Sequence, residues 1–184
     1  MGKNNLIMDK EFKLISEQKL LKVLEAYFCW KETSGKVKKL NGRGINIPES
    51  ISESIVCYFN SFSRDKKKGS HDAISLQGKT IQIKATSAFN NELTSFSPKQ
   101  GKFDELHFAR FNIEKDEVWL YEIPKKELDS TVLNKEKNET FLQQQEQGRR
   151  PRFSIVKVFI EKYQLKPYKK VNLHELLKNC HEKV

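Results

Sequence analysis

The sequence predicts an α/β (α+β) fold in which helices flank a mixed central sheet of about five strands. Two kinds of apolar pattern lead to this fold class. Apolar residues recur at helical spacing near both ends of the chain, and the middle contains several short β-prone stretches. The chain of 184 residues has the length that one hydrophobic core commonly serves, roughly 100–200 residues. Residues 1–184 are therefore expected to form a single domain.

Two helices are expected in the first third of the chain. Asp9 can cap a helix that runs to about Trp30, because apolar residues in between form one stripe at helical spacing. Residues 33–44 are rich in Gly and Lys and are expected to form an exposed loop. Pro48 suits the first position of a second helix, which continues to Phe59.

The sheet is expected from four stretches. Residues 71–86 predict a β-hairpin that turns at residues 77–78, and residues 106–111 and 118–123 predict two further strands. Residues 152–160 are expected to add a strand. Between them, the polar residues 134–148 fit either an exposed helix or a mobile excursion. Asn172 and Glu175 can cap a C-terminal helix.

The charge of the chain points to a polyanionic partner. The 34 Lys and Arg outnumber the 24 Asp and Glu, which gives a formal net charge of +10. A field of this sign attracts nucleic acid, although a basic protein without such a partner fits the charge equally well. No segment approaches the roughly 20 apolar residues of a membrane span, and the N-terminus lacks the apolar run of a signal peptide. We expect a cytoplasmic protein.

The hairpin carries the residues that predict a catalytic site. Residues 80–84 alternate strictly, so Gln82 and Lys84 share one face of the strand. Hydrolysis of a phosphodiester needs an activated water and stabilisation of charge on phosphate oxygens, which Mg²⁺ held by oxygen ligands can supply. Asp72, the amide oxygen of Gln82 and the backbone carbonyl of Ile83 are candidate ligands, and the Lys84 ammonium can polarise the water.

Acidic residues on the preceding helix can complete this cluster. Glu53 is our first choice, and Glu49 is one turn away. A simpler reading makes Asp72 and Lys84 a surface ion pair of little energetic value. Similarly, Glu49 and Glu53 can be acids that the helix dipole favours near an N-terminus.

Three segments together resemble the PD-(D/E)xK nuclease superfamily. They are GINIPESISESIVCYFN, SHDAISLQGKTIQIKATS and KFDELHFARFNIEKDEVWLYEI, and they are similar to small type II restriction endonucleases, closest to the group that cuts GCNGC. The resemblance implies a restriction endonuclease-like fold, Mg²⁺ with Mn²⁺ able to substitute, and catalytic roles for Asp72, Gln82 and Lys84, with Glu53 compensating. The chain departs from the superfamily at Gln82, where a second acid is usual, so the site would hold one negative charge less.

The resemblance also implies duplex DNA as substrate and a homodimer that matches the symmetry of a palindromic site. The expected DNA-contacting residues are basic: Lys36, Lys38, Lys39, Arg43, Lys66, Lys67, Lys68, Lys99, Lys102, Arg149, Arg150 and Arg152. The three arginines are candidates for base readout, phosphate contact or solvated charge. Two other functions remain open at this point: a non-catalytic DNA-binding module, and a repair or RNA-processing nuclease.

Overall fold

A computed structural model describes residues 12–65, 71–89 and 103–183. In these residues a mixed sheet has the strand order β1-β2-β3-β4-β5-β8, with β3 and β4 parallel and the other neighbours antiparallel. Its strands are β1 (Ser63–Arg64), β2 (Ala73–Ile74), β3 (Thr80–Thr86), β4 (Glu105–Asn112), β5 (Glu117–Ile123) and β8 (Lys169–Asn172). The expected fold class is confirmed, with six strands in place of about five.

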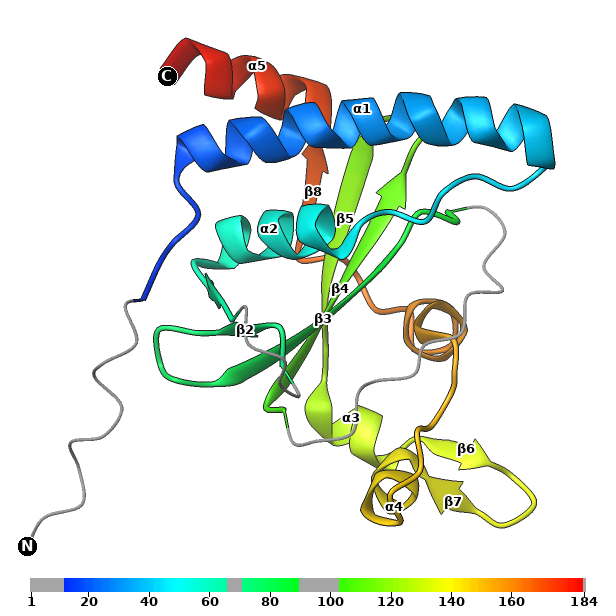
Figure 1. Cartoon of the computed structure of the whole chain (residues 1–184). Helices are drawn as coiled ribbons and strands as arrows, with labels where there is room; N and C mark the ends of the chain where they lie inside the picture. Colours follow the sequence, from blue (N-terminus) through cyan, green and yellow to red (C-terminus); the bar gives the residue numbers. More distant parts are fainter. Residues whose placement is uncertain (1–11, 66–70, 90–102, 184) are drawn as a thin grey trace, which may run out of the picture.

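Three helices form a layer beside this sheet (Figure 1). They are α1 (Glu17–Asn41), α2 (Glu49–Asn60) and α5 (Leu173–Lys183). Pro48 was expected to be the first residue of this helix, but it is the N-cap of α2, and the helix begins one residue later at Glu49. The side chain of Asn172 accepts from the backbone N–H groups of His174 and Glu175, so it caps α5 as expected. No helix in the described ranges is both long and apolar enough to cross a membrane.

The first helix differs from its expected bounds at both ends. Its N-cap is Ser16, which accepts from the N–H of Lys19, whereas Asp9 lies outside the described residues. The expected loop at residues 33–44 is wrong, because α1 continues to Asn41 and ends at Gly42 in the left-handed conformation (φ 70°). Lysine favours helices, and Gly35 in the helix costs only about 1 kcal/mol relative to Ala. Packing of α1 over the sheet outweighs that cost.

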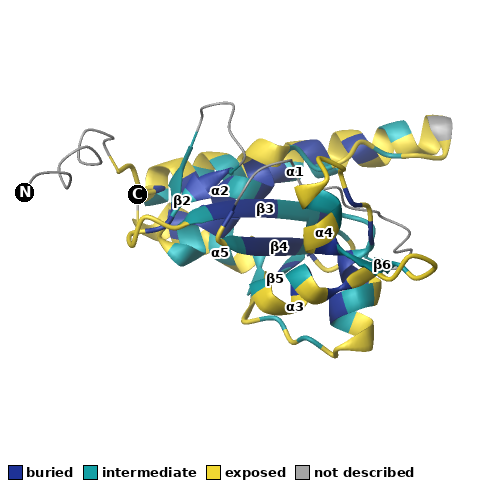
Figure 2. Ribbon diagram, turned by 90° about the horizontal axis from the view of Figure 1, so that it is seen from below, coloured by how far each residue is buried: buried dark blue, intermediate teal, exposed yellow. Residues whose placement is uncertain are grey.

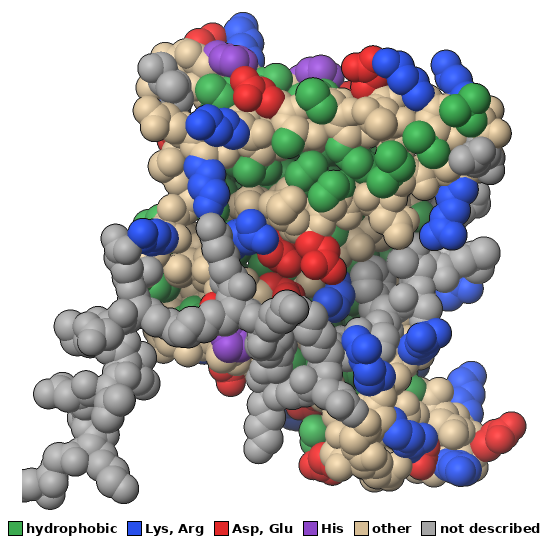
Figure 3. Space-filling view, viewed as in Figure 1, with side chains coloured by type: hydrophobic (Ala, Val, Ile, Leu, Met, Phe, Trp, Pro, Cys, Tyr) green, Lys and Arg blue, Asp and Glu red, His purple; other side chains and the backbone are tan. Residues whose placement is uncertain are grey.

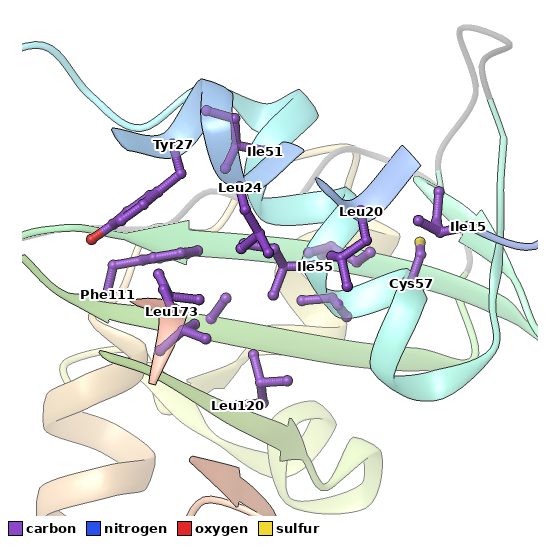
Figure 4. Close-up of a cluster of buried hydrophobic side chains, with 14 of the residues drawn as sticks. Ile15, Leu20, Leu24, Tyr27, Ile51, Ile55, Cys57, Phe111, Leu120 and Leu173 are labelled. Atoms are coloured by element: carbon purple, nitrogen blue, oxygen red, sulfur yellow. The ribbon is translucent and has the colours of Figure 1, made fainter. Parts of the chain in front are cut away.

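The apolar alternation of the sheet produces two cores. The first core lies between the sheet and the helices α1, α2 and α5, and includes Leu24, Ile55, Phe111 and Leu120 (Figure 4). Most residues of β3 and β4 are buried, as the view from below shows (Figure 2). Ile81 and Ile83 of β3 belong to this first core. The second core lies on the opposite face of the sheet, where Phe108 and Tyr121 are buried.

A small lobe and a π-helix cover the second core. The lobe contains α3 (Lys125–Ser130), the hairpin β6 (Val132–Asn134) and β7 (Glu139–Thr140), and α4 (Phe141–Glu146). The expected strand at residues 152–160 is wrong, because the chain forms a π-helix at Val156–Lys162. Ile155, Val156 and Phe159 are buried at helical spacing, and the same apolar run also fits a buried strand. Their contacts with the second core select the helix.

Candidate active site at the free edge of β3

In the described residues, one edge of strand β3 is paired with a neighbouring strand over only part of its length. β2 pairs with β3 only at Ile81 and Thr80, whereas β4 pairs with β3 from Ile81 to Thr86. A cavity of about 460 Å³ lies beside the partly paired edge, between the start of α2 and the end of β3. Its lining includes Glu49, Glu53, Ile83 and Lys84. Two segments that are far apart in the sequence therefore meet at this edge.

The carboxylate of Asp72 is fixed where β2 separates from β3. The Asp72 N–H donates to the carbonyl of Ile81 at 2.8 Å, and its side-chain Oδ2 accepts from the N–H of Ile83 at 2.7 Å. The Asp72 carboxylate thus accepts the hydrogen bond that the Ile83 N–H would otherwise donate to a neighbouring strand. Asp72 is buried. The carboxylate is held next to the residues on both sides of Ile83.

Gln82 and Lys84 lie on the face of β3 opposite α1 and α2. The register pairs them with Leu106 and Phe108, both of the second core, whereas Ile81 and Ile83 belong to the first core. This confirms that Gln82 and Lys84 share a face. Lys84 is half-buried and lines the cavity. No ion pair of Lys84 occurs among the described residues, so the simpler reading of an Asp72–Lys84 pair finds no support.

The amide of Gln82 is the most unusual feature of the site. The side chain is fully buried, and neither its Oε1 nor its Nε2 has a hydrogen-bond partner in the part of the chain that the structure describes. Buried polar groups in folded proteins are nearly always paired, because an unpaired one costs about 1–3 kcal/mol. Both polar atoms of this amide therefore remain available to a ligand or to an ordered water.

Glu53 approaches Asp72 from α2 but is held by an arginine. The Arg64 guanidinium donates to Glu53 Oε2 through Nε at 3.1 Å and also through Nη2, and its Nη1 reaches Ser54 Oγ at 3.4 Å. Burial raises the pKa of Glu53, Arg64 lowers it, and the charges of Asp72 and Glu49 raise it further, with a net upward direction. The acids on α2 and β2 therefore share one electrostatic environment.

These groups fit a divalent cation in part. The orphaned Gln82 amide oxygen, the Asp72 carboxylate and the Glu53 carboxylate are the hard oxygen donors that Mg²⁺ prefers. No cluster of three or more His, Cys, Asp or Glu side chains with metal-ligand geometry is present among the described residues. The acidic cluster expected from the sequence is thus incomplete, because position 82 is an amide and because Arg64 occupies one oxygen of Glu53.

The basic residues expected at DNA fall into two places. Lys36, Lys38 and Lys39 are exposed on the last turns of α1, with Arg43 just beyond it, and Lys36 pairs with Glu32. Arg149, Arg150 and Arg152 are exposed after α4, and Arg149 pairs with Glu139. Lys66, Lys67, Lys68, Lys99 and Lys102 lie outside the described residues. Figure 3 shows acidic side chains at the centre of one face, with lysines and arginines towards its rim.

Arg64 is the site residue that sequence reasoning missed. It lies in β1, eleven residues after Glu53. A single arginine between two elements carries no local pattern, so only the packing of β1 against α2 shows its role. Thr86, which follows Lys84 by two residues on the same face of β3, was also not singled out.

Comparison with known proteins identifies the family of the chain. Residues 15–162 match the family model described as Bsp6I restriction endonuclease. The chain is 37% identical over 163 residues to the type II restriction enzyme Bsp6I of Bacillus sp. (strain RFL6), an alignment that covers 89% of this chain and 93% of that protein. The match spans α1, α2, the candidate site and the sheet as far as the π-helix. The chain belongs to the Bsp6I restriction endonuclease family.

Proposed function

We propose that the chain hydrolyses phosphodiester bonds of double-stranded DNA at a short palindromic site, with Mg²⁺ as cofactor and Mn²⁺ able to replace it. Family membership supports the class of reaction. The observation that carries the metal-dependent part is the fully buried, unpartnered amide of Gln82 beside the fixed Asp72 carboxylate. This arrangement is a variant of the PD-(D/E)xK site in which an amide replaces the second acid.

The ligands in this proposal are Asp72, Gln82 Oε1, the carbonyl of Ile83 and Glu53. The bound ion supplies Lewis-acid stabilisation of charge on the phosphate oxygens. Asp72 is oriented by the Ile83 N–H, which also prevents its carboxylate from turning away. Lys84 lies one residue beyond, where its ammonium orients the attacking water and lowers the cost of removing a proton from it. Arg64 keeps Glu53 in place and balances part of the acidic charge.

The choice between Glu53 and Glu49 can be tested by metal binding. Both line the cavity, but only Glu53 is half-buried, and Glu49 is exposed. Glu53→Gln should weaken Mn²⁺ binding at least about tenfold, because loss of even a residue that only orients a metal ligand commonly costs that much. Glu49→Gln should change it by less than about threefold. Isothermal titration with Mn²⁺ measures both, and the reverse order would exchange the assignments.

The decisive test of the reaction is incubation of the purified protein with a large duplex of known sequence. With Mg²⁺ we expect discrete fragments, and with a chelator intact DNA. Lys84→Ala should bind a labelled duplex with unchanged affinity and lose cleavage by about 10²–10⁴-fold. Lys79→Ala, just before the same strand and with an exposed side chain, is the matched control and should cleave normally. A metal-dependent smear would indicate a repair nuclease, and binding without cleavage would indicate a DNA-binding module.

The same experiment addresses recognition and assembly. We propose GCNGC as the recognition sequence, from the resemblance described above, and a homodimer that presents one site to each strand. Sequencing the fragment ends would show whether every cut lies at GCNGC. Analytical ultracentrifugation would show whether the protein is dimeric. Cuts at another palindrome would replace the proposed sequence, and a strictly monomeric active protein would overturn the proposed assembly.

A further inference from the structure

Four side chains form a second basic feature on the face of the sheet that carries Gln82 and Lys84. They are Arg110 of β4, Trp119 of β5, Lys170 of β8, and Phe89, which follows β3. We call them the cation–aromatic row. The register pairs Thr86 with Arg110, Arg110 with Trp119, and Trp119 with Lys170. The row therefore crosses the strands and begins two residues beyond Lys84.

Each cation of the row is seated on an aromatic ring. The Arg110 guanidinium lies 4.1 Å from the centroid of Phe89, and its Nη2 donates to the Phe89 carbonyl at 2.9 Å. The Lys170 ammonium lies 3.9 Å from the centroid of Trp119. The rings of Phe89 and Trp119 meet edge to face at 5.0 Å. These contacts restrict the positions of both cations before any ligand arrives, which reduces the entropy lost on binding.

The row has the charge and length of a site for a nucleic-acid backbone. Within the described residues Glu117 contacts the row, because its carboxylate accepts from the Trp119 indole N–H at 3.2 Å. Neighbouring strands are about 4.8 Å apart, so the three steps from β3 to β8 span roughly 14 Å. That length corresponds to about four base pairs along the axis of a DNA duplex, at roughly 3.4 Å each. Lys170 is exposed, and Arg110 and Trp119 are half-buried, so the row lies at the surface.

We infer that the cation–aromatic row binds the sugar–phosphate backbone of duplex DNA and guides one strand across β3, β4, β5 and β8 towards Lys84. This inference rests on the proposed function and adds a contact surface to it. The row shares its sheet face with the second core and lies at the end of the sheet where β3 and β4 finish. The contacts are to phosphates, so they contribute affinity for any sequence and positioning of the strand, without base readout.

The chain offers a matched pair of lysines to test this surface. Lys169 precedes Lys170 in β8, points to the opposite face, and seats its ammonium 4.5 Å from the ring centroid of Phe59 in α2. Both are exposed lysines on an aromatic ring. Lys170→Ala and Lys169→Ala therefore remove the same charge and the same kind of contact. Only Lys170→Ala removes it from the proposed DNA face.

The measurement is the salt dependence of binding to a short labelled duplex containing GCNGC, by fluorescence anisotropy in a chelator. Lys170→Ala should lower the slope of log affinity against log salt by about 0.9, the loss of one phosphate contact, and weaken binding roughly eightfold at about 0.1 M salt. Lys169→Ala should match the unaltered protein. Equal slopes for the two variants would overturn the inference while leaving cleavage of DNA, and thus the proposed function, intact.

A second readout keeps the test independent of any change in folding. The chain has two tryptophans, and Trp30 is buried in α1. In a Trp30→Phe background the emission of Trp119 alone should change when the same duplex is added. The double variant Trp30→Phe/Trp119→Phe is the control and should show no change in emission when the duplex is added. A steady Trp119 signal at a duplex concentration that saturates anisotropy would also overturn the inference, and failure of every variant to bind duplex would overturn the proposed function with it.

Discussion

Replacement of Gln82 by leucine should make the protein more stable and inactive. Leucine is similar in size to glutamine, and the Gln82 amide has no hydrogen-bond partner in the described part of the chain. Removing an unpaired buried polar group recovers about 1–3 kcal/mol, so the free energy of unfolding should rise by that amount. For a chain of this length each kcal/mol corresponds to about 2–4 °C in Tm. Mn²⁺ binding and DNA cleavage should be lost at the same time.

The assay is urea unfolding followed by circular dichroism in a chelator, with Mn²⁺ titration in parallel. Asn112→Leu is the matched control, because Asn112 is also a buried amide but its Oδ1 accepts from the N–H of Lys115 at 3.2 Å. That variant should lose about 0.5–1.5 kcal/mol. Gln82→Glu should be destabilised in chelator at neutral pH and recover with Mg²⁺, because a buried carboxylate needs a counter-charge. If Gln82→Leu were as destabilised as Asn112→Leu, or still cleaved DNA, the metal-ligand assignment would be refuted.

Two further predictions concern stability. Arg64→Ala should lower the free energy of unfolding by about 2–4 kcal/mol, because it leaves the largely buried Glu53 carboxylate unpaired. Lys79→Ala removes the more exposed ion pair with Glu105 and should cause no measurable loss of stability. The pKa of Glu53 is raised in the folded state chiefly by burial, so ionisation of Glu53 opposes folding as pH rises through the folded pKa. The loss of unfolding free energy in Arg64→Ala, measured by urea unfolding, should therefore be larger at about pH 8 than at about pH 4. An equal loss at both pH values would contradict this account. Burial lowers the pKa of His107 in the folded state, and Glu105 opposes this shift. The fold therefore favours neutral His107. This contribution to stability is fully present above the unfolded pKa of about 6.5 and is lost as pH falls through the folded pKa. His107→Gln should therefore lose less stability than the unaltered protein between about pH 7.5 and pH 5, and parallel curves would show that His107 does not titrate in this way.

Local patterns in the sequence predicted the hairpin and the geometry of its second strand. Strict alternation at residues 80–84 determined that Gln82 and Lys84 share a face, because side chains alternate along any strand. The turn at Gly78, which has a φ of 78°, follows from the freedom of glycine to adopt positive φ. The strands β4 and β5 were predicted on the same basis and are confirmed. These features depend on neighbours in the chain, so the sequence alone determined them.

Only the tertiary structure decided the features that depend on distant partners. The apolar run at residues 152–160 fits a strand or a helix, and contact with the second core selected the π-helix. The pairing of Arg64 with Glu53 arises where β1 packs against α2, and the unpartnered state of Gln82 arises where β3 faces the second core. Hydrogen bonding and burial are properties of the surroundings in space. The sequence supplies the polar groups, and packing determines which of them form hydrogen bonds within the protein.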